Sequence, residues 1–308
     1  MYYGGIDVGG TKTICAVAGD DGKIIERVQF LTDKIAPELF FDGCCKRLEE
    51  LCKAAGCTFS DLQGIGITLP GMVNENNLLL HAPFLEWHNT DVVGIVQERT
   101  GVKNIRCECD VNACGVAEAK RSKYKNFLWV TVSTGIGSAV MIDGKVFRGA
   151  HSVSGEVGHN KVEYEHPLTC TCGQLGCAEI QASGAALTRL VLAKCKEDPD
   201  YDRLYEEKRL KRDGSGCSAL AKEGEERSLA LFAKVGDYLG KAIAYAVNIL
   251  DPECVYIGGG MSRSFDLLYP HIRARLKSDV VSFSSDTPVL ATTLGYDASI
   301  IGAIALVM

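Results

Sequence analysis

The sequence of 308 residues has no long apolar run and no excess of basic residues. A membrane-spanning helix needs about 18 consecutive apolar residues, and no segment approaches that length. The first seven residues contain neither a basic stretch nor a cleavable apolar segment, so nothing predicts secretion. The formal net charge of −6 opposes a nucleic-acid-binding surface, which needs a basic face to neutralise phosphates. The sequence therefore predicts a soluble, cytoplasmic protein with no membrane or nucleic-acid partner.

The composition is that of an ordinary globular chain. Hydrophobic residues make up 46% and charged residues 23% of the sequence, which excludes a disordered protein. At about 150 residues per domain, the length predicts two domains. The 14 cysteines, in a chain with no predicted export signal, indicate thiols or metal ligands rather than a disulfide scaffold.

Both halves of the sequence begin with the same order of predicted elements. In the first half, strands at 3–8, 13–18 and 23–31 are separated by a glycine turn and an Asp-Gly-Lys turn. In the second half, strands at 127–133 and 138–142 and a short third strand follow the same order. This internal symmetry predicts an α/β protein with two similar domains that face each other across a cleft.

Apolar spacing predicts three long helices. They cover residues 39–55, 228–250 and 298–307, and Ser228 is the expected N-cap of the second. The charge-rich residues 196–226 are expected to form a solvated helical face and a loop.

Two glycine turns are candidates for phosphate binding. The first consists of Gly9, Gly10, Thr11 and Lys12. It lies between two predicted strands, so it is neither a P-loop nor a dinucleotide fingerprint, both of which lead into a helix. Its backbone N–H groups, hydroxyl and ammonium would attract phosphate, and the preceding Asp7 would hold hydrated Mg²⁺. The alternative is a plain hairpin. A second such turn at Thr134 and Gly135 favours the interpretation that the two turns bind one triphosphate from opposite domains.

Three consecutive glycines follow a predicted strand and precede a predicted helix. They are Gly258, Gly259 and Gly260. Glycine lets backbone approach its neighbours closely. The run therefore indicates either tight packing of strand against helix or a backbone surface on which a flat nucleoside lies.

Asp110 lies where a predicted strand at 105–109 ends and a helical pattern begins. Aspartate is a favoured N-cap, so a purely structural role is one interpretation. The other is a general base at the carboxyl end of a strand, where α/β proteins bind their ligands. Phosphoryl transfer to an alcohol needs a carboxylate that orients the hydroxyl and accepts its proton. At this point both interpretations stay open.

Three cysteines occur within eight residues, separated by two glycines. They are Cys170, Cys172 and Cys177, and His159 precedes them by eleven residues. Three thiolates and one imidazole satisfy tetrahedral zinc with no open position, which predicts a structural site. The alternatives are free thiols or redox chemistry, and His166 competes with His159 as the fourth ligand.

Together these motifs resemble those of the ROK family (repressors, open reading frames, kinases), which has the actin-like ATPase (ribonuclease H-like) fold. The resemblance covers nearly the whole chain. It is carried by Asp7–Lys12, Leu69–Val73, Glu86-Trp87, Cys109–Ala113, Ser133–Gly137, Gly155–His159 and Cys170–Glu179.

The resemblance implies a kinase that transfers the γ-phosphoryl group of MgATP to a hexose hydroxyl, usually O6. Asp110 would be the general base. The phosphates would lie at the two glycine turns and the adenosine at Gly258–Gly260. A structural zinc ion would be held by His159 and the three cysteines. The sugar hydroxyls would be bound by Glu156, His159 and Glu179, with help from the backbone of Gly71.

The resemblance also implies the domain boundaries and the assembly. The first α/β domain would contain residues 1–112 and 295–308, because the last helix of the family packs back on that domain. The second would contain residues 113–294, with the zinc-binding loop. Members of the family are commonly homodimers or homotetramers.

Cys109 departs from the family pattern, because glucokinase-type members have at this position an asparagine that hydrogen-bonds the sugar. A thiol is a weak donor and acceptor, so the sequence does not identify the sugar. A sugar sensor with weak catalysis is therefore one alternative. Two others are an actin-like ATPase with an iron–sulfur cluster that activates a partner enzyme, and a repressor. The repressors carry an N-terminal helix-turn-helix, whereas the first phosphate motif begins here at Asp7.

Overall fold

The repeated order of strands and turns in the sequence produces two five-stranded sheets with the same internal order. The computed structural model describes residues 1–308, except for the side chain of Tyr296. The chain divides into two units, each with its own core. Unit 1 contains residues 1–125, 139–154 and 293–308, and unit 2 contains residues 126–138 and 155–292.

The first sheet lies in unit 1. Its strands are β1 (Tyr2–Val8), β2 (Lys12–Ala18), β3 (Ile24–Leu31), β4 (Leu62–Leu69) and β8 (Ile105–Cys109). The order is β3-β2-β1-β4-β8, with β1 antiparallel to β2 and parallel to β4, and β4 parallel to β8. In this register Asp7 lies opposite Thr68, and Leu69 lies opposite Cys109. The carboxyl ends of β1, β4 and β8 therefore meet at one edge of the sheet.

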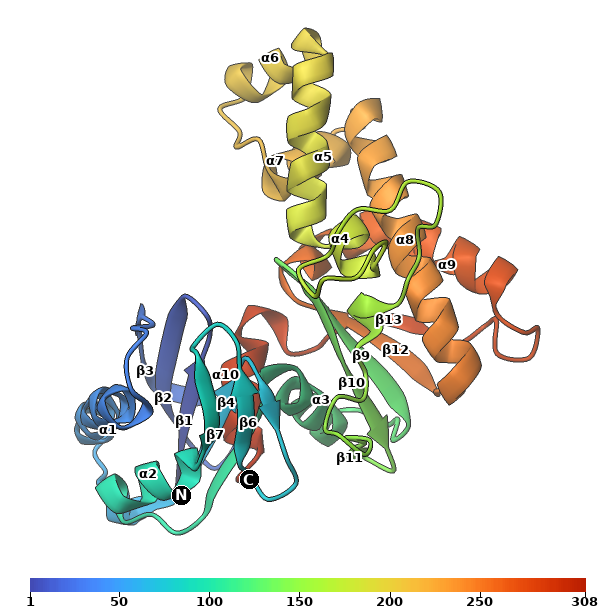
Figure 1. Cartoon of the computed structure of the whole chain (residues 1–308). Coiled ribbons are helices and arrows are strands. Elements are labelled where there is room, and N and C mark those ends of the chain that lie inside the picture. Colours follow the sequence, from blue (N-terminus) through green and yellow to red (C-terminus); the bar gives the residue numbers. More distant parts are fainter. The chain divides into compact units, whose positions relative to one another are not determined.

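Helices cover both faces of this sheet. Alternate residues of β2 point to opposite faces: Cys15 and Val17 belong to one buried cluster, Ala16 and Ala18 to another. The first cluster is covered by α1 (Pro37–Ala54) and α2 (Val92–Thr100), the second by α10 (Ala298–Ala305). Figure 1 shows α10 in red beside the blue and teal strands of the sheet. Two short 3₁₀ turns complete this part, η1 (Phe59–Asp61) and η4 (Gly295–Asp297).

Glycines on β1 and β4 allow α10 to touch the sheet. A Cβ on Gly66 would lie 1.7 Å from the carbonyl oxygen of Ala303, and a Cβ on Gly5 would lie 2.9 Å from Ile300 and Ile304. At Gly66 no side chain fits without moving the helix backbone, and at Gly5 the side chains of Ile300 and Ile304 would have to shift. The helix α3 (Asp110–Arg121) packs on α10 in the same way, because a Cβ on Gly302 would lie 2.8 Å from the backbone of Ala113.

A small antiparallel sheet follows β4 in the chain. It consists of β5 (Met72–Val73), β6 (Leu79–Ala82) and β7 (Trp87–Thr90), in that order. Trp87 is buried against the rings of Phe40 and Phe41, and its indole N–H donates to the carbonyl of Ile35 at 2.9 Å. This contact fixes the small sheet to α1.

The second sheet repeats the first. Its strands are β9 (Phe127–Val132), β10 (Ile136–Ile142), β11 (Lys145–Val146), β12 (Cys254–Gly258) and β13 (Val289–Ala291). The order is β11-β10-β9-β12-β13, with β12 parallel to both β9 and β13. In each sheet the third strand of the meander is at the edge and the first is in the centre, as the internal symmetry predicts. The meander of the second sheet ends on a two-residue strand.

Most of the helices belong to unit 2. They are α4 (Ala178–Ala182), α5 (Gly184–Glu197), α6 (Pro199–Glu207), α7 (Gly214–Lys222), α8 (Glu226–Leu250) and α9 (Phe265–Asp279), with 3₁₀ turns η2 (Val157–His159) and η3 (Gly260–Ser264). The charge-rich segment 196–226 forms α6, α7 and their loops. Ser228 is not the N-cap of α8, because the helix begins two residues earlier and the carboxylate of Glu225 accepts from the Ser228 amide at 2.7 Å.

The two units divide the chain at different residues from the predicted domains. Residues 113–125 belong to unit 1, because residues 113–121 are part of α3, which packs on α10. Residues 139–154 also belong to unit 1; within this segment Met141 lies against Gly115 of α3. The last helix belongs to unit 1 together with β1 and β4. None of the described helices is long and apolar enough to cross a membrane.

The contact between α10 and the sheet gives a first prediction. We expect Gly66→Ala to lower the free energy of unfolding by about 2–3 kcal/mol, because the new methyl group would meet a helix backbone that cannot move aside cheaply. Denaturant unfolding followed by circular dichroism measures this change. Gly19→Ala is the control, because its Cβ has only ordinary contacts at 3.5 Å and beyond. Equal stability of the two variants would contradict the close approach.

Candidate functional site

Asp110 is the first residue of α3 and follows directly on the last residue of β8. The N-cap of the helix is Cys109, so the N-cap interpretation of Asp110 is wrong. One carboxylate oxygen of Asp110, Oδ1, accepts from the Val111 amide at 2.9 Å and from the Cys109 thiol at 3.5 Å. Burial raises the pKa of Asp110, and these two donors only partly oppose the shift. A carboxylate with a raised pKa at a strand end has the properties of a general base.

Asp7 is a second carboxylate, half-buried, at the same edge of the first sheet. It accepts from the Thr68 hydroxyl at 2.8 Å, across the parallel pair β1 and β4. Burial raises the pKa of Asp7 to about 7, and the negative charge of Asp110 adds to the shift. The negative charge of one carboxylate makes ionisation of a nearby carboxylate less favourable, and a cation bound beside both would stabilise their ionised forms.

The first glycine turn joins β1 to β2 and carries exposed polar groups at its tip. The turn is closed by a hydrogen bond from the Gly9 amide to the Lys12 carbonyl at 2.9 Å. Thr32, the residue directly after β3, braces it, since its hydroxyl donates to the Gly9 carbonyl and its amide to the Thr11 carbonyl. Gly10, Thr11 and Lys12 remain exposed. The tip therefore presents a hydroxyl and an ammonium to solvent.

Gly71 lies between β4 and β5, where no other residue fits. A Cβ there would lie 2.4 Å from the carbonyl oxygen of His81 on the neighbouring strand. Its amide donates to the Leu69 carbonyl at 2.9 Å. Asp7, the first glycine turn, Gly71 and Asp110 all belong to unit 1.

In unit 2, Glu179 supports the second glycine turn. Its carboxylate accepts from the Ile136 amide at 3.0 Å, and a Cβ on Gly135 would lie 2.5 Å from the same oxygen. The other oxygen accepts from the Thr171 hydroxyl at 3.2 Å. Glu179 at the start of α4 thus connects the turn that carries Thr134 and Gly135 to the cysteine loop.

The predicted metal ligands come together in unit 2. The ligand atoms of His159, Cys170, Cys172 and Cys177 all lie within 4.8 Å of one another. The Cys172 and Cys177 sulfurs are 3.7 Å apart, as are the Cys170 sulfur and His159 Nδ1. Zinc–sulfur bonds of about 2.3 Å in a tetrahedron place two sulfurs about 3.7 Å apart. The cluster can therefore hold a metal ion, and His166 is not part of it.

The loop that carries the cysteines is tightly folded. Gly176 has φ +76°, and a Cβ there would lie 2.1 Å from the Glu163 carbonyl oxygen. The Cys170 amide donates to the Gln174 carbonyl at 2.8 Å. A hydrogen bond from the Gln174 amide lowers the pKa of Cys172, which favours the thiolate that binds metal.

His159 has a different neighbour at each ring nitrogen. Nδ1 faces the Cys170 sulfur, whereas Nε2 lies 3.9 Å from a carboxylate oxygen of Glu156. The turn η2 places both residues. Glu156 is exposed, so its carboxylate is accessible to a ligand.

The glycine run after β12 is shaped mainly by packing. A Cβ on Gly258 would lie 2.4 Å from the Trp129 ring, and Gly259 has φ +79° and lies against Thr131 and Val132. Only Gly260 has room for a side chain, with its nearest contact at 3.6 Å from the Ser133 hydroxyl. Tight packing explains the first two glycines, and a role in nucleoside binding stays a prediction.

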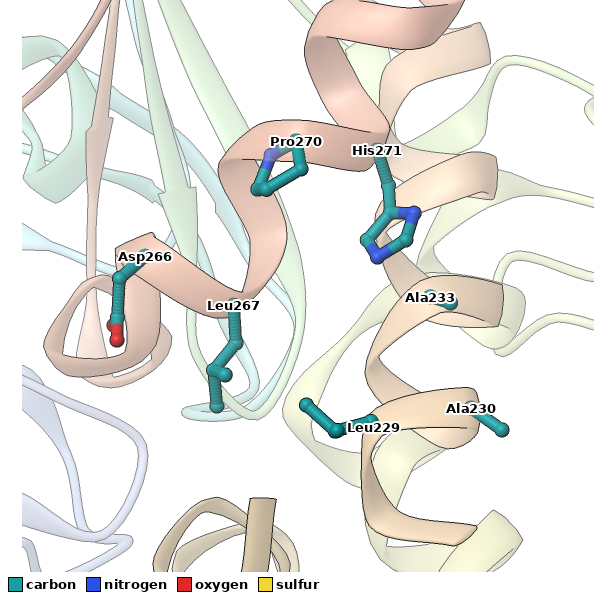
Figure 2. A pocket seen from close by; sticks show the side chains of 7 residues that line it. All are labelled: Leu229, Ala230, Ala233, Asp266, Leu267, Pro270 and His271. Carbon is teal, nitrogen blue, oxygen red and sulfur yellow. The ribbon is translucent and has the colours of Figure 1, made fainter. Parts of the chain in front are cut away.

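A pocket of about 340 Å³ lies between α8 and α9, and none of the predicted site residues lines it (Figure 2). Most of its lining is apolar, with one carboxylate and one imidazole at the edge. The lining residues are Leu229, Ala230, Ala233, Asp266, Leu267, Pro270 and His271. It therefore contributes nothing to the candidate site.

Two charged residues next to Asp110 were not predicted. Glu108 is 2% exposed although it alternates in sequence with apolar residues of β8, the pattern of a solvent-facing position. Its carboxylate forms an ion pair with Arg148, from the segment after β11. The only signal in the sequence is a glutamate two residues before a candidate base.

Comparisons with known proteins identify the relatives of this chain. The ROK family matches residues 3–308. The glucokinase of Thermotoga maritima is 30% identical over 317 residues, covering 98% of this chain and 96% of that protein. The structure of a ROK family glucokinase from Streptomyces griseus, in complex with glucose and AMPPNP, matches with a TM-score of 0.81 and 26% identity over 99% of both chains. The xylose repressor of Bacillus spizizenii is 26% identical over all of this chain and 77% of the repressor.

The fold and the glucokinase relatives support a carbohydrate kinase, a phosphotransferase built of two α/β units. The chain belongs to the ROK family. The predicted actin-like α/β fold class is confirmed by the match to the ROK glucokinase structure.

The raised pKa of Asp7 predicts a pH-dependent stability. The folded protein holds a proton at Asp7 up to pH about 7, whereas an unfolded carboxyl has the ordinary pKa of 3.8. The contribution of protonated Asp7 to the free energy of unfolding is therefore present at low pH and is lost as the pH rises from about 3.8 to about 7. We expect Asp7→Asn to raise Tm at pH 8, without magnesium or nucleotide, and the gain to shrink at pH 5. The exposed Asp20→Asn is the control, and a gain independent of pH would contradict this account.

The cysteine cluster predicts coupled loss of metal and stability. We expect Cys172→Ser to lose bound metal and to lower Tm, because a structural metal contributes its binding free energy to folding. Elemental analysis and thermal unfolding, each with and without a chelator, measure the two effects. Cys195→Ser removes a buried thiol outside the cluster and should keep the metal. A metal-free variant with unchanged Tm would contradict a structural role.

Proposed function

We propose that the chain is an ATP-dependent sugar kinase that transfers the γ-phosphoryl group of ATP to a hexose hydroxyl, with O6 as the acceptor. The observation that carries the proposal is Asp110, a half-buried carboxylate with a raised pKa at the carboxyl end of β8. The glucokinase relatives, which match over nearly their whole length, support a carbohydrate kinase.

In the proposed reaction Asp110 acts on the acceptor hydroxyl. Its Oδ1 is held by two donors, so Oδ2 is the oxygen available to accept the proton. Removal of this proton makes the sugar oxygen a better nucleophile toward the γ-phosphorus, and the ADP oxygen leaves. The raised pKa brings the base closer to neutral pH, where a proton acceptor is most effective.

The phosphate groups are assigned to the two glycine turns, which contain Gly9, Gly10, Thr11 and Lys12 and Thr134 and Gly135. Backbone amides, the Thr11 hydroxyl and the Lys12 ammonium would balance the phosphate charge. Asp7 would hold hydrated Mg²⁺, which neutralises negative charge on the transferring phosphoryl group when bound. The backbone at Gly258, Gly259 and Gly260 would contact the adenosine.

The sugar is assigned to Glu156, His159 and Glu179, with the backbone of Gly71. The observation that supports this is the two-sided position of His159, whose Nδ1 faces the cysteine cluster and whose Nε2 faces Glu156. A zinc ion on His159, Cys170, Cys172 and Cys177 would have no open coordination position and so would be structural. Its role would be to fix the ring of His159 for hydrogen bonding with a sugar hydroxyl.

A ROK sugar sensor with weak catalysis is the second candidate. The match to a xylose repressor favours it, since repressors share this domain. An ATPase that activates a partner through an iron–sulfur cluster is less well supported, because the cysteine trio comes together with an imidazole. A homodimer or homotetramer and a cytoplasmic location stay predictions, and light scattering of the purified protein tests the first.

The proposed function is tested by ADP release in a coupled assay over a sugar panel. The panel contains glucose, allose, mannose, fructose, N-acetylglucosamine and N-acetylmannosamine. A kinase gives sugar-dependent turnover with at least one of them, and mass spectrometry identifies the sugar phosphate. Sugar binding without turnover would favour the sensor.

We expect Asp110→Asn to lower kcat by about 10²- to 10⁴-fold, the usual contribution of a general base, and to leave sugar affinity largely intact. Initial rates and calorimetric sugar binding measure the two quantities. Asp33→Asn, at an exposed position of the same unit, is the control. Near-wild-type turnover of Asp110→Asn would remove this residue from the mechanism.

A further inference from the structure

Glu108 is a buried carboxylate two residues before Asp110 that the proposed reaction does not use. Only 2% of the residue is exposed. Its Oε1 accepts from the Cys109 amide at 2.9 Å and from the Asn112 side-chain amide at 3.1 Å. These donors lie on the two sides of Asp110 in the chain. One carboxylate therefore fixes the last residue of β8 to the first turn of α3, and Asp110 is held between them.

Arg148 supplies the positive charge for this carboxylate. Its guanidinium donates to Oε2 of Glu108, the oxygen that the other two donors leave free. Burial raises the pKa of Glu108, and the positive charge of Arg148 opposes that shift. Arg148 thus favours the ionised form of Glu108, the form that accepts from all three donors.

The backbone that carries Arg148 is itself held in place. The Arg148 carbonyl accepts from the Ser154 amide at 3.0 Å, which closes the segment into a loop within unit 1. Gly149 takes φ +70° in this loop. Two residues beyond Ser154 in the chain is Glu156, one of the predicted sugar ligands. Arg148 therefore lies on an ordered loop of unit 1 shortly before a predicted sugar ligand in the chain.

We propose that Glu108 and Arg148 are positioning residues that hold the Cys109–Asp110 junction so that Oδ2 of Asp110 is aimed at the acceptor hydroxyl. This inference rests on the proposed role of Asp110 as the base. A buried ion pair contributes little to stability compared with apolar residues of the same volume. A carboxylate whose two oxygens both accept hydrogen bonds does, however, fix the geometry of the backbone around it. A displacement of about 1 Å at a reacting group costs about 10²-fold in rate.

Arg148→Met tests the proposal, because it keeps the side-chain stem and removes the charge. Arg212→Met is the matched control: Arg212 pairs with Asp202 and Glu206 in unit 2, and its side chain is 34% exposed against 31% for Arg148. We expect kcat of Arg148→Met to fall by about 10- to 100-fold, with the KM for ATP unchanged. Guanidinium ion at millimolar concentration should restore part of kcat, since it can re-pair Glu108. Arg212→Met should keep wild-type kcat.

Alkylation of Cys109 gives a second readout that does not require activity. The Cys109 amide donates to Glu108, so loss of the pair should loosen this residue and expose its thiol. We expect iodoacetamide to modify Cys109 faster in Arg148→Met than in wild type or Arg212→Met, as measured by site-resolved mass spectrometry. Guanidinium should slow this reaction again.

The outcomes separate this proposal from the proposed function. Wild-type kcat and wild-type Cys109 reactivity in Arg148→Met would overturn it. A fall in Tm and kcat without rescue by guanidinium, and with Cys109 still protected, would reduce the pair to a structural contact and also overturn it. If wild type phosphorylates no sugar on the panel, the proposed function fails, and Cys109 reactivity still decides whether the pair holds the junction.

Discussion

The structure of unit 1 depends on the absence of side chains where α10 meets the first sheet. Gly5 and Gly66 bring the helix into contact with the strand backbones, and Gly302 brings α3 close to α10. The start of α3 is the point where Asp110 leaves the sheet. A helix at the far end of the sequence thus sets the position of the candidate base. Close packing of backbone transmits any displacement, because interiors have few voids that could absorb it.

Burial of charge is the second constraint. Asp7, Glu108 and Asp110 are three carboxylates near the carboxyl ends of β1 and β8, the two strands that flank β4, and burial raises the pKa of each. Each has a different partner: a hydroxyl for Asp7, a guanidinium for Glu108, and a thiol and an amide for Asp110. The free-energy cost of burying these carboxylates is confined to one edge of the sheet. Clusters of acidic groups with perturbed pKa values are typical of functional sites.

Much of the architecture could be predicted from the sequence, because it rests on local patterns. The strand–turn–strand order gave both meanders, and the cysteine spacing identified the metal cluster. Long-range contacts could not be predicted in this way. Glu108 alternates with apolar residues and yet is buried, because Arg148, forty residues later, neutralises it. The predicted start of α8 is two residues late for a different, local reason: the cap is the glutamate Glu225, which accepts from the helix amide as a serine would.

The two nitrogens of His159 are chemically linked through one ring. A neutral imidazole carries a single proton, so a metal ion on Nδ1 obliges Nε2 to be the N–H. Toward Glu156 and any bound hydroxyl, that nitrogen then donates and cannot accept. A metal ion in the cysteine cluster therefore requires that a ligand group next to Nε2 of His159 be a hydrogen-bond acceptor. Without the metal ion, the ring proton of His159 could move between Nδ1 and Nε2, and Nε2 would no longer be restricted to donating a hydrogen bond.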